Sequence, residues 1–235
     1  MWTQQPIIGF DTETTGVRPL DDRLVTCSLI KAEENGIERR YWLADPGVEI
    51  PEQAANVHGI STEKARSEGR PVGEVLAEIA DILAEHMAAG NPVVAFNASY
   101  DFTLLESELA RHGIPTLAER LGGPLAPIVD PYLLDKSVDK WRKGKRRLED
   151  VCRHYGVLDE DNFHNAEADV LATLRLLGAL VRKYPEVADK SLREIQAMQA
   201  ASHADFIIYL NRRAAQVGRR PAGDRDAWRF SSRLV

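Results

Sequence analysis

The pattern of apolar and polar residues predicts an α/β protein. Short apolar runs predict buried strands, whereas segments with apolar residues every three or four positions predict amphipathic helices. The expected strands are a run that begins at residue 7, followed by 24–30, 37–43, 93–96 and 127–130. The expected helices are a short one at 51–56, then 72–89, one that ends at residue 112, 148–155, 166–184 and a longer one through 192–210.

The order of these elements indicates how the sheet is built. The first three strands are close in sequence, and Asn35-Gly36 between the second and third is a strong hairpin signal. The later strands alternate with helices, which is typical of parallel pairing. We therefore expect a mixed five-stranded sheet with helices on both faces. Functional sites in such sheets gather at the carboxyl ends of the strands.

Composition and charge narrow the class of protein. The chain has 235 residues, of which 44% are hydrophobic, so it has room for one large domain with an appendage. We expect a domain at 1–184 and a C-terminal helix with a basic tail at 185–235. The net charge of -6 argues against nucleic-acid binding by bulk electrostatics, but a nuclease with metal-binding acids remains compatible with it.

Cysteine usage and hydropathy suggest the compartment. Cys27 and Cys152 form no metal-binding or disulfide pattern. The chain begins without a signal-like apolar segment, and its longest apolar run, 170–181, is too short to span a bilayer. We therefore expect a cytoplasmic protein without a membrane partner.

Two carboxylates follow the first apolar run. Asp11 and Glu13 are two positions apart in a strand, so their side chains project from the same face. Like charges this close raise each other's proton affinity, and a divalent cation between them reverses that effect. The alternative for this motif alone is a solvated strand end.

Three further residues lie next to a strand end or a helix start. They are Asp101, after the strand at 93–96, and His164 with Asp169, at the start of the helix at 166–184. Each has a structural alternative. Asp101 can be a helix N-cap or a first-turn acid that the helix dipole favours, Asp169 can be a solvated helix residue, and His164 can be a loop residue or a cap. The set of five instead predicts one site.

Three motifs resemble the DEDD superfamily of 3'-5' exonucleases, in its histidine-containing DEDDh branch. Phe-Asp-Thr-Glu-Thr-Thr-Gly at 10–16 is similar to the first family motif and Asn-Ala-Ser-Tyr-Asp-Phe at 97–102 to the second. The third is His-Asn-Ala-Glu-Ala-Asp at 164–169, which has the H-x4-D spacing. The resemblance covers residues 6–184. Members of this branch include the epsilon proofreading subunit of bacterial DNA polymerase III, ribonuclease T and the oligoribonucleases.

The resemblance implies a ribonuclease H-like fold and catalysis with two divalent ions, Mg²⁺ or Mn²⁺. It assigns Asp11 as the bridging ligand, with Glu13 and Asp169 completing one metal site. Asp101 would serve the other site, and His164 would be the general base. Independently of the resemblance, a cluster of carboxylates without sulfur suits hard cations, and histidine titrates near neutral pH.

The resemblance also points to residues around the last nucleotide. Thr14 would approach the 3'-hydroxyl, and His58 and Ile60 would line the pocket. Asn97 and Phe102 would support the site, with core packing as the alternative for Phe102. Asp130, followed by Pro131, is better explained as a helix cap than as a ligand.

The densest basic segment is the run at 140–147, Lys-Trp-Arg-Lys-Gly-Lys-Arg-Arg. With Trp141 available for stacking, it is a candidate guide for a single strand, and a solvated loop is the alternative.

Together these observations predict a 3'-5' exonuclease that releases nucleoside 5'-monophosphates, with single-stranded DNA favoured over RNA as its substrate. One alternative is an RNA-trimming or oligoribonucleotide exonuclease. Another is a proofreading-type subunit that acts through a polymerase partner, joined by residues 185–235. Phosphatases with an aspartyl nucleophile fit poorly, because Glu13 takes the place of their second aspartate.

Overall fold

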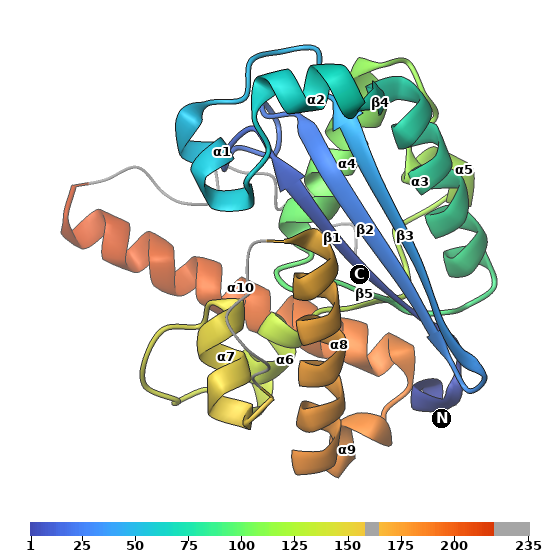
Figure 1. Cartoon of the computed structure of the whole chain (residues 1–235). Helices are drawn as coiled ribbons and strands as arrows, with labels where there is room; N and C mark the ends of the chain where they lie inside the picture. Colours follow the sequence, from blue (N-terminus) through green and yellow to red (C-terminus); the bar gives the residue numbers. More distant parts are fainter. Residues whose placement is uncertain (158–164, 219–235) are drawn as a thin grey trace.

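A twisted sheet forms the centre of the computed structural model, which describes residues 1–157 and 165–218 (Figure 1). In the described part of the chain the sheet has six strands in the order β4-β3-β2-β1-β5-β6. The strands are β1 (Ile7–Thr14), β2 (Leu24–Glu33), β3 (Gly36–Asp45), β4 (Arg70–Pro71), β5 (Val93–Val94) and β6 (Ile128–Val129). The first three are antiparallel neighbours, whereas β5 is parallel to both β1 and β6.

The helices fall between and after the strands. A short 3-10 helix, Trp2–Gln4, precedes β1. The α-helices are α1 (Glu52–His58), α2 (Thr62–Glu68), α3 (Val72–Ala88), α4 (Ser99–Arg111), α5 (Leu117–Leu121), α6 (Pro131–Val138), α7 (Leu148–Tyr155), α8 (Ala166–Lys183), α9 (Pro185–Ala188) and α10 (Leu192–Gln216). None of these described helices combines the length and the apolar character needed to cross a lipid bilayer.

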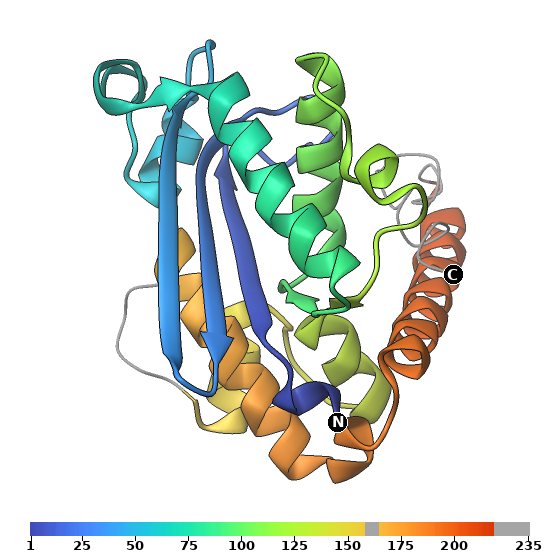
Figure 2. The ribbon, with the colours of Figure 1, turned by 90° about the vertical axis from the view of Figure 1, so that its right-hand side faces the viewer.

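Helices cover the sheet on two sides, with α3 and α4 on one and α8 on the other (Figure 2). Strand alternation decides which residues of β1 face each side. Ile8 and Phe10 belong to the core beneath α3 and α4, where the Phe10 ring lies 5.3 Å from that of Phe102. Gly9 faces α8, and a Cβ at this position would lie only 2.4 Å from Val170 Cγ1. Glycine thus lets α8 approach the backbone of β1.

The predicted fold class is confirmed, with differences in the smaller elements. The hairpin between β2 and β3 is present, and Glu33 pairs with Gly36 across its turn. Strand β4 was not predicted, because it is only two residues long and one of them is Pro71. Helix α2 was not predicted either, because it is short and has no apolar periodicity. Its N-cap is Ser61, whose hydroxyl accepts the Lys64 N–H at 3.2 Å.

The first half of α10 packs on β6 and α6. Ile195 is fully buried in the same apolar cluster as Val129 and Leu134. Gln199 joins the helix to the strand, because its amide donates to the Ile128 carbonyl at 3.0 Å and accepts from the Asp130 N–H at 2.6 Å. The division of the chain at residue 184 stays a prediction.

Candidate active site

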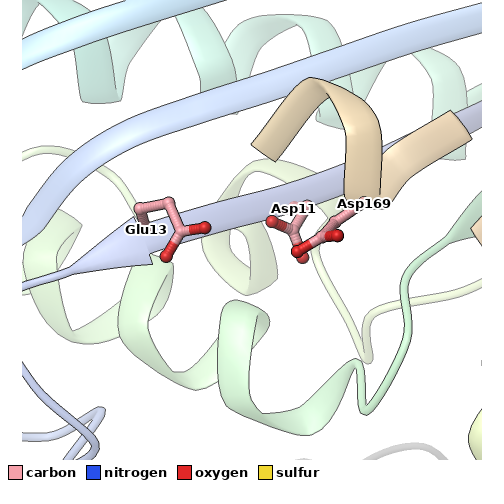
Figure 3. Close-up of side chains that lie close together, drawn as sticks. All are labelled: Asp11, Glu13 and Asp169. Carbon is pink, nitrogen blue, oxygen red and sulfur yellow. The ribbon is translucent and has the colours of Figure 1, made fainter. Parts of the chain in front are cut away.

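Three carboxylates meet where the carboxyl half of β1 passes the first turns of α8. Asp11 and Glu13 come from the strand and Asp169 from the helix (Figure 3). Each offers one oxygen such that the three oxygens lie within 4.8 Å of one another, and all three residues are partly buried. Within the described residues, this is the one cluster of three or more His, Cys, Asp or Glu side chains with the spacing of a metal site.

Local sequence explains this convergence. Gly9, Asp11 and Glu13 alternate with buried residues along β1, so they share the face that α8 covers. Helix α8 begins at a cap, because the Asn165 side chain accepts the Glu167 and Ala168 N–H groups at 3.0 and 3.4 Å. Asp169 follows in the first turn of the helix, so the cap and the close approach at Gly9 together place its carboxylate beside Asp11.

The cluster has an unfavourable electrostatic environment for three negative charges. Burial, followed by the charges of Asp101, Asp169 and Glu13, raises the pKa of Asp11 well above its ordinary value. Burial and the charges of Asp169 and Asp101 raise the pKa of Glu13 to about 7. A divalent cation among these oxygens would reverse this balance, since it stabilises the charged form of every carboxylate. The chemistry of the oxygens and their spacing therefore fit such a cation.

Asp101 lies beside the cluster but is held differently. It is the third residue of α4 and is only 3% exposed. Its Oδ1 accepts the Thr12 N–H at 3.1 Å and the Thr12 hydroxyl at 2.7 Å. Burial raises its pKa to about 7 although these hydrogen bonds oppose the rise. Its charge raises the pKa values of Asp11 and Glu13, so the fourth predicted carboxylate belongs to the same electrostatic site.

A second buried carboxylate, Asp130, holds the turn that precedes α4. It accepts backbone N–H groups from Asn97 at 2.9 Å, Ala98 at 3.0 Å and Tyr132 at 2.9 Å. The interpretation of Asp130 as the N-cap of α6 is confirmed. The sequence did not indicate its bonds to Asn97 and Ala98. Asn97 has a φ of 61°, which is the left-handed region that few non-glycine residues adopt, and Asp130 stabilises this turn.

Two of the residues expected around a terminal nucleotide, Thr14 and His58, lie close to each other. Thr14 is buried at the end of β1, where its Oγ1 lies 2.6 Å from both the Gly16 carbonyl and the Tyr100 hydroxyl. His58 ends α1, and its Nδ1 accepts the Ile60 N–H at 3.2 Å. Burial lowers the pKa of His58, and the nearby Thr14 backbone partly offsets this, which places the histidine beside Thr14.

Ile60 and Phe102 are largely enclosed. Ile60 is 8% exposed and packs with Val25 and Ile50, whereas Phe102 is 1% exposed and packs against Phe10. The geometry of Phe102 is that of the core-packing alternative. His164 lies outside the described residues, so its predicted place in the site stays a prediction. Sequence reasoning did not single out Thr12 and Tyr100, because neither residue type is a metal ligand or a base in this setting.

Comparison with known proteins identifies the fold and its relatives. Residues 8–177 match the exonuclease family RNase_T, over more than half of the chain. The PolC-type DNA polymerase III of Streptococcus thermophilus is 26% identical over 177 residues, which are 74% of this chain and 11% of the polymerase. The enzyme of Streptococcus suis is 27% identical over 173 residues, which are 72% of this chain and 11% of the polymerase.

Solved structures of E. coli exonuclease I are similar to this fold. The zinc-bound form in complex with single-stranded DNA has a TM-score of 0.63 at 18% identity, and the match covers 79% of this chain and 42% of that one. The complex with a dA16 oligonucleotide has a TM-score of 0.61 at 19% identity, with the same coverage. This chain thus spans about a tenth of the polymerases and less than half of exonuclease I. The family match confirms the resemblance drawn from the three motifs: the chain belongs to the exonuclease family, as a DEDD-type member.

Proposed function

We propose that this protein is a metal-dependent 3'-5' exonuclease of the DEDDh type. It hydrolyses DNA from the 3' end and releases nucleoside 5'-monophosphates, with a preference for single strands. The observation that carries the proposal is the meeting of Asp11, Glu13 and Asp169, with oxygens within 4.8 Å of one another, beside the buried Asp101. Carboxylates that repel one another at neutral pH, in a family of exonucleases, are suited to divalent cations.

The residues divide naturally between two ions. Asp11, Glu13 and Asp169 would hold one Mg²⁺ or Mn²⁺, and Asp11 with Asp101 would hold the second. Asp101 stands apart from the three-oxygen group and already accepts two hydrogen bonds from Thr12, which fits a ligand that acts partly through water. Two such ions supply charge that stabilises both the attacking and the leaving oxygen of a displacement at phosphorus.

The remaining roles concern the proton and the substrate end. His164 would accept a proton from the attacking water, because histidine titrates near neutral pH and belongs to the third motif. Thr14 and His58 would bind the 3'-terminal nucleotide. The closeness of His58 to Thr14 supports this, since it brings the end of α1 to the end of β1 that carries Asp11 and Glu13. Ile60 and Asn97 would support that pocket.

DNA is the substrate we favour over RNA. The similar exonuclease I structures hold single-stranded DNA, and the similar curated proteins are DNA polymerases. The match to a tenth of those polymerases also motivates a polymerase partner, which residues 185–235 would contact. An RNA substrate is the alternative, and the experiment must distinguish it from a DNA substrate.

The test is degradation of 5'-labelled single strands of DNA and RNA of the same sequence with Mn²⁺ or Mg²⁺. We expect a ladder that shortens from the 3' end and is faster on DNA. Asp11→Ala and chelation should abolish it, whereas Asp189→Ala, which removes a carboxylate after α9, should not. Shortening of RNA alone would overturn the DNA assignment. Activity that persists in Asp11→Ala would overturn the proposed site.

A further inference from the structure

The basic loop between α6 and α7 has an unusual internal support. Arg142 and Arg146 both turn inward and form ion pairs with Asp135, whose side chain is fully buried. The Tyr155 hydroxyl donates to the other oxygen of Asp135 at 3.0 Å. The two arginines also donate to loop carbonyls, Arg142 to Lys145 at 3.2 Å and Arg146 to Asp139 at 2.7 Å. These contacts with the buried Asp135 and with the loop carbonyls therefore fix the conformation of the loop.

Four other side chains of the same loop point into solvent. Trp141 is 86% exposed, and Lys143, Lys145 and Arg147 are also exposed. None of these three cations forms an ion pair with another residue in the described ranges 1–157 and 165–218, whereas Lys140 pairs with Asp205 at 2.9 Å. The loop thus contains two kinds of residue. Two arginines neutralise a buried acid, and between them and beside them lie an exposed tryptophan and three cations without an ion-pair partner in the described ranges.

This loop leads into α7, which packs against the helix that carries Asp169. Arg147 is the N-cap of α7, and α7 packs against α8. Cys152, five residues further on, is buried where its Sγ lies 3.9 Å from the Ala172 carbonyl of α8. Five residues of helix rise only about 7.5 Å. Asp169 lies one turn before Ala172, and burial, followed by the charge of Asp169, raises the pKa of Cys152. The end of the basic loop, at Arg147, therefore lies at the start of the helix that packs against α8, which carries Asp169.

We propose that the loop at residues 139–147 is a second contact for single-stranded nucleic acid, away from the 3' end. Trp141 stacks on a base, and Lys143, Lys145 and Arg147 contact phosphates. The inference rests on the proposed function, since it assigns a path to the strand whose end reaches the metals. It goes beyond that function because no catalytic residue is involved.

The chemistry of the loop favours this occupant. A protein with a net charge of -6 repels polyanions in general, so a local group of unpaired cations is needed to attract a strand. A tryptophan interleaved with cations suits a chain of bases and phosphates, because stacking is independent of sequence. Since the Asp135 anchor already orders the loop, less conformational entropy is lost when a strand binds.

The test measures binding of fluorescently labelled dT20 by anisotropy, in chelator and at several salt concentrations. The variants are Trp141→Ala and the double variant Lys143→Ala/Lys145→Ala. Both leave Asp135, Arg142 and Arg146 in place. The charge-matched control is Arg182→Ala/Lys190→Ala, because Arg182 lies about 20 Å along α8 from Asp169.

We expect Trp141→Ala to weaken binding about tenfold. The double lysine variant should reduce the slope of log affinity against log salt by about 1.4, since each phosphate contact contributes about 0.7 on single strands. The control should change neither quantity. Wild-type affinity and wild-type salt slope in both loop variants would overturn the inference.

A separate measurement distinguishes failure of the loop inference from failure of the proposed function. The p-nitrophenyl ester of thymidine 5'-monophosphate offers a phosphodiester but no second nucleotide that could reach the loop. If the wild-type protein with Mn²⁺ cleaves neither the ester nor dT20, the proposed function fails, and the binding data still decide the role of the loop. If it cleaves the ester while the loop variants bind dT20 normally, only the loop inference is lost.

Discussion

Thr12 donates both its backbone N–H and its side-chain hydroxyl to one oxygen of Asp101, at 3.1 and 2.7 Å. The two residues are 89 positions apart, so this pair joins the strand that carries Asp11 and Glu13 to the helix that carries the fourth carboxylate. Thr12 occupies the strand position between the two acids and projects from the opposite face. The link therefore fixes Asp101 relative to the cluster.

Replacing Thr12 by valine removes the hydroxyl while it conserves the shape of the side chain. We expect Thr12→Val to lower the free energy of unfolding by about 1 kcal/mol, the usual contribution of one buried hydrogen bond. It should also lower kcat, because Asp101 is then less well held, and a loss of order tenfold corresponds to about 1.4 kcal/mol. Denaturant unfolding and initial rates on dT20 measure the two effects.

Thr12→Ser is the matched control because it keeps the donor. It should retain most of the activity, even where the lost methyl group reduces stability. If the serine and valine variants had equal rates, the hydroxyl would have no role in positioning Asp101.

Asp130 provides the second prediction. Its carboxylate accepts three backbone N–H groups, and asparagine would replace one of these acceptors by an NH₂ group. We expect Asp130→Asn to lower the free energy of unfolding by about 2 kcal/mol, because at least one buried N–H loses its acceptor. It should also lower kcat by loosening the Asn97 turn before α4.

Asp189→Asn, at a position after α9 that is remote from this turn in sequence, serves as the control for Asp130→Asn and should match the wild type in both measurements. A stable Asp130→Asn variant with wild-type kcat would show that the turn needs no such support.

Gly9 provides a test of how closely α8 must approach β1. A Cβ at this position would lie 2.4 Å from Val170 Cγ1 and 3.1 Å from Leu174, so the Val170 side chain and the helix that carries it have to give way. We expect Gly9→Ala to cost about 1–3 kcal/mol of stability, as overpacking does, and to reduce activity because Asp169 moves with α8.

Gly73→Ala is the control for Gly9→Ala. Gly73 lies in α3 with open space where a Cβ would stand, so alanine should be neutral or stabilise the protein by up to about 1 kcal/mol. Thermal unfolding of both variants, with rates on dT20, checks the pair. Equal activity in Gly9→Ala and wild type would mean that Asp169 does not depend on this approach.

Local signals in the sequence predicted most of the fold. The apolar run at β1, the Asn35-Gly36 turn and the helical spacing in α8 are each explained by neighbouring residues. Strand β4 and helix α2 escaped prediction, since a two-residue strand has no periodicity and α2 is a polar helix of seven residues. Contacts with distant parts of the chain stabilise such elements, and a short stretch of sequence does not predict these contacts.

The candidate site could also be predicted only in part. Asp11, Glu13, Asp101 and Asp169 could be predicted because carboxylates at strand ends and helix starts have a recognisable chemistry. The bond between Thr12 and Asp101 could not, because it depends on the packing of α4 against β1. The inward turn of Arg142 and Arg146 was also hidden, since a run of basic residues gives no sign of which members pair with a buried Asp135.

The raised pKa values in the cluster predict how stability depends on pH in the absence of metal. Burial and the charges of neighbouring carboxylates raise the pKa of Asp11 well above its ordinary value and that of Glu13 to about 7, and burial with the charge of Asp130 raises that of Asp101 to about 7. In the unfolded chain the pKa values of the same groups are about 4. Between these values the three carboxyl groups bind more protons in the folded state than in the unfolded state, so their contribution to the free energy of unfolding falls as the pH rises from about 4 to about 7.

Thermal unfolding in chelator should therefore show a lower Tm at pH 7.5 than at pH 5. About 5 °C or more is expected, since one pKa unit corresponds to about 1.4 kcal/mol and each kcal/mol to about 2–4 °C for a chain of this size. Mn²⁺ should raise the Tm much more at pH 7.5 than at pH 5, because protonated carboxylates bind it poorly. Asp11→Asn removes one of the repelling charges, so it should flatten the pH dependence in chelator and weaken the response to Mn²⁺, whereas Asp189→Asn should change neither. Burial lowers the pKa of His203 to about 4, and this acts in the opposite direction between pH 5 and pH 7. The decisive comparison is therefore between the wild type and Asp11→Asn, and the same pH dependence of Tm in both would contradict the repulsion on which the metal assignment depends.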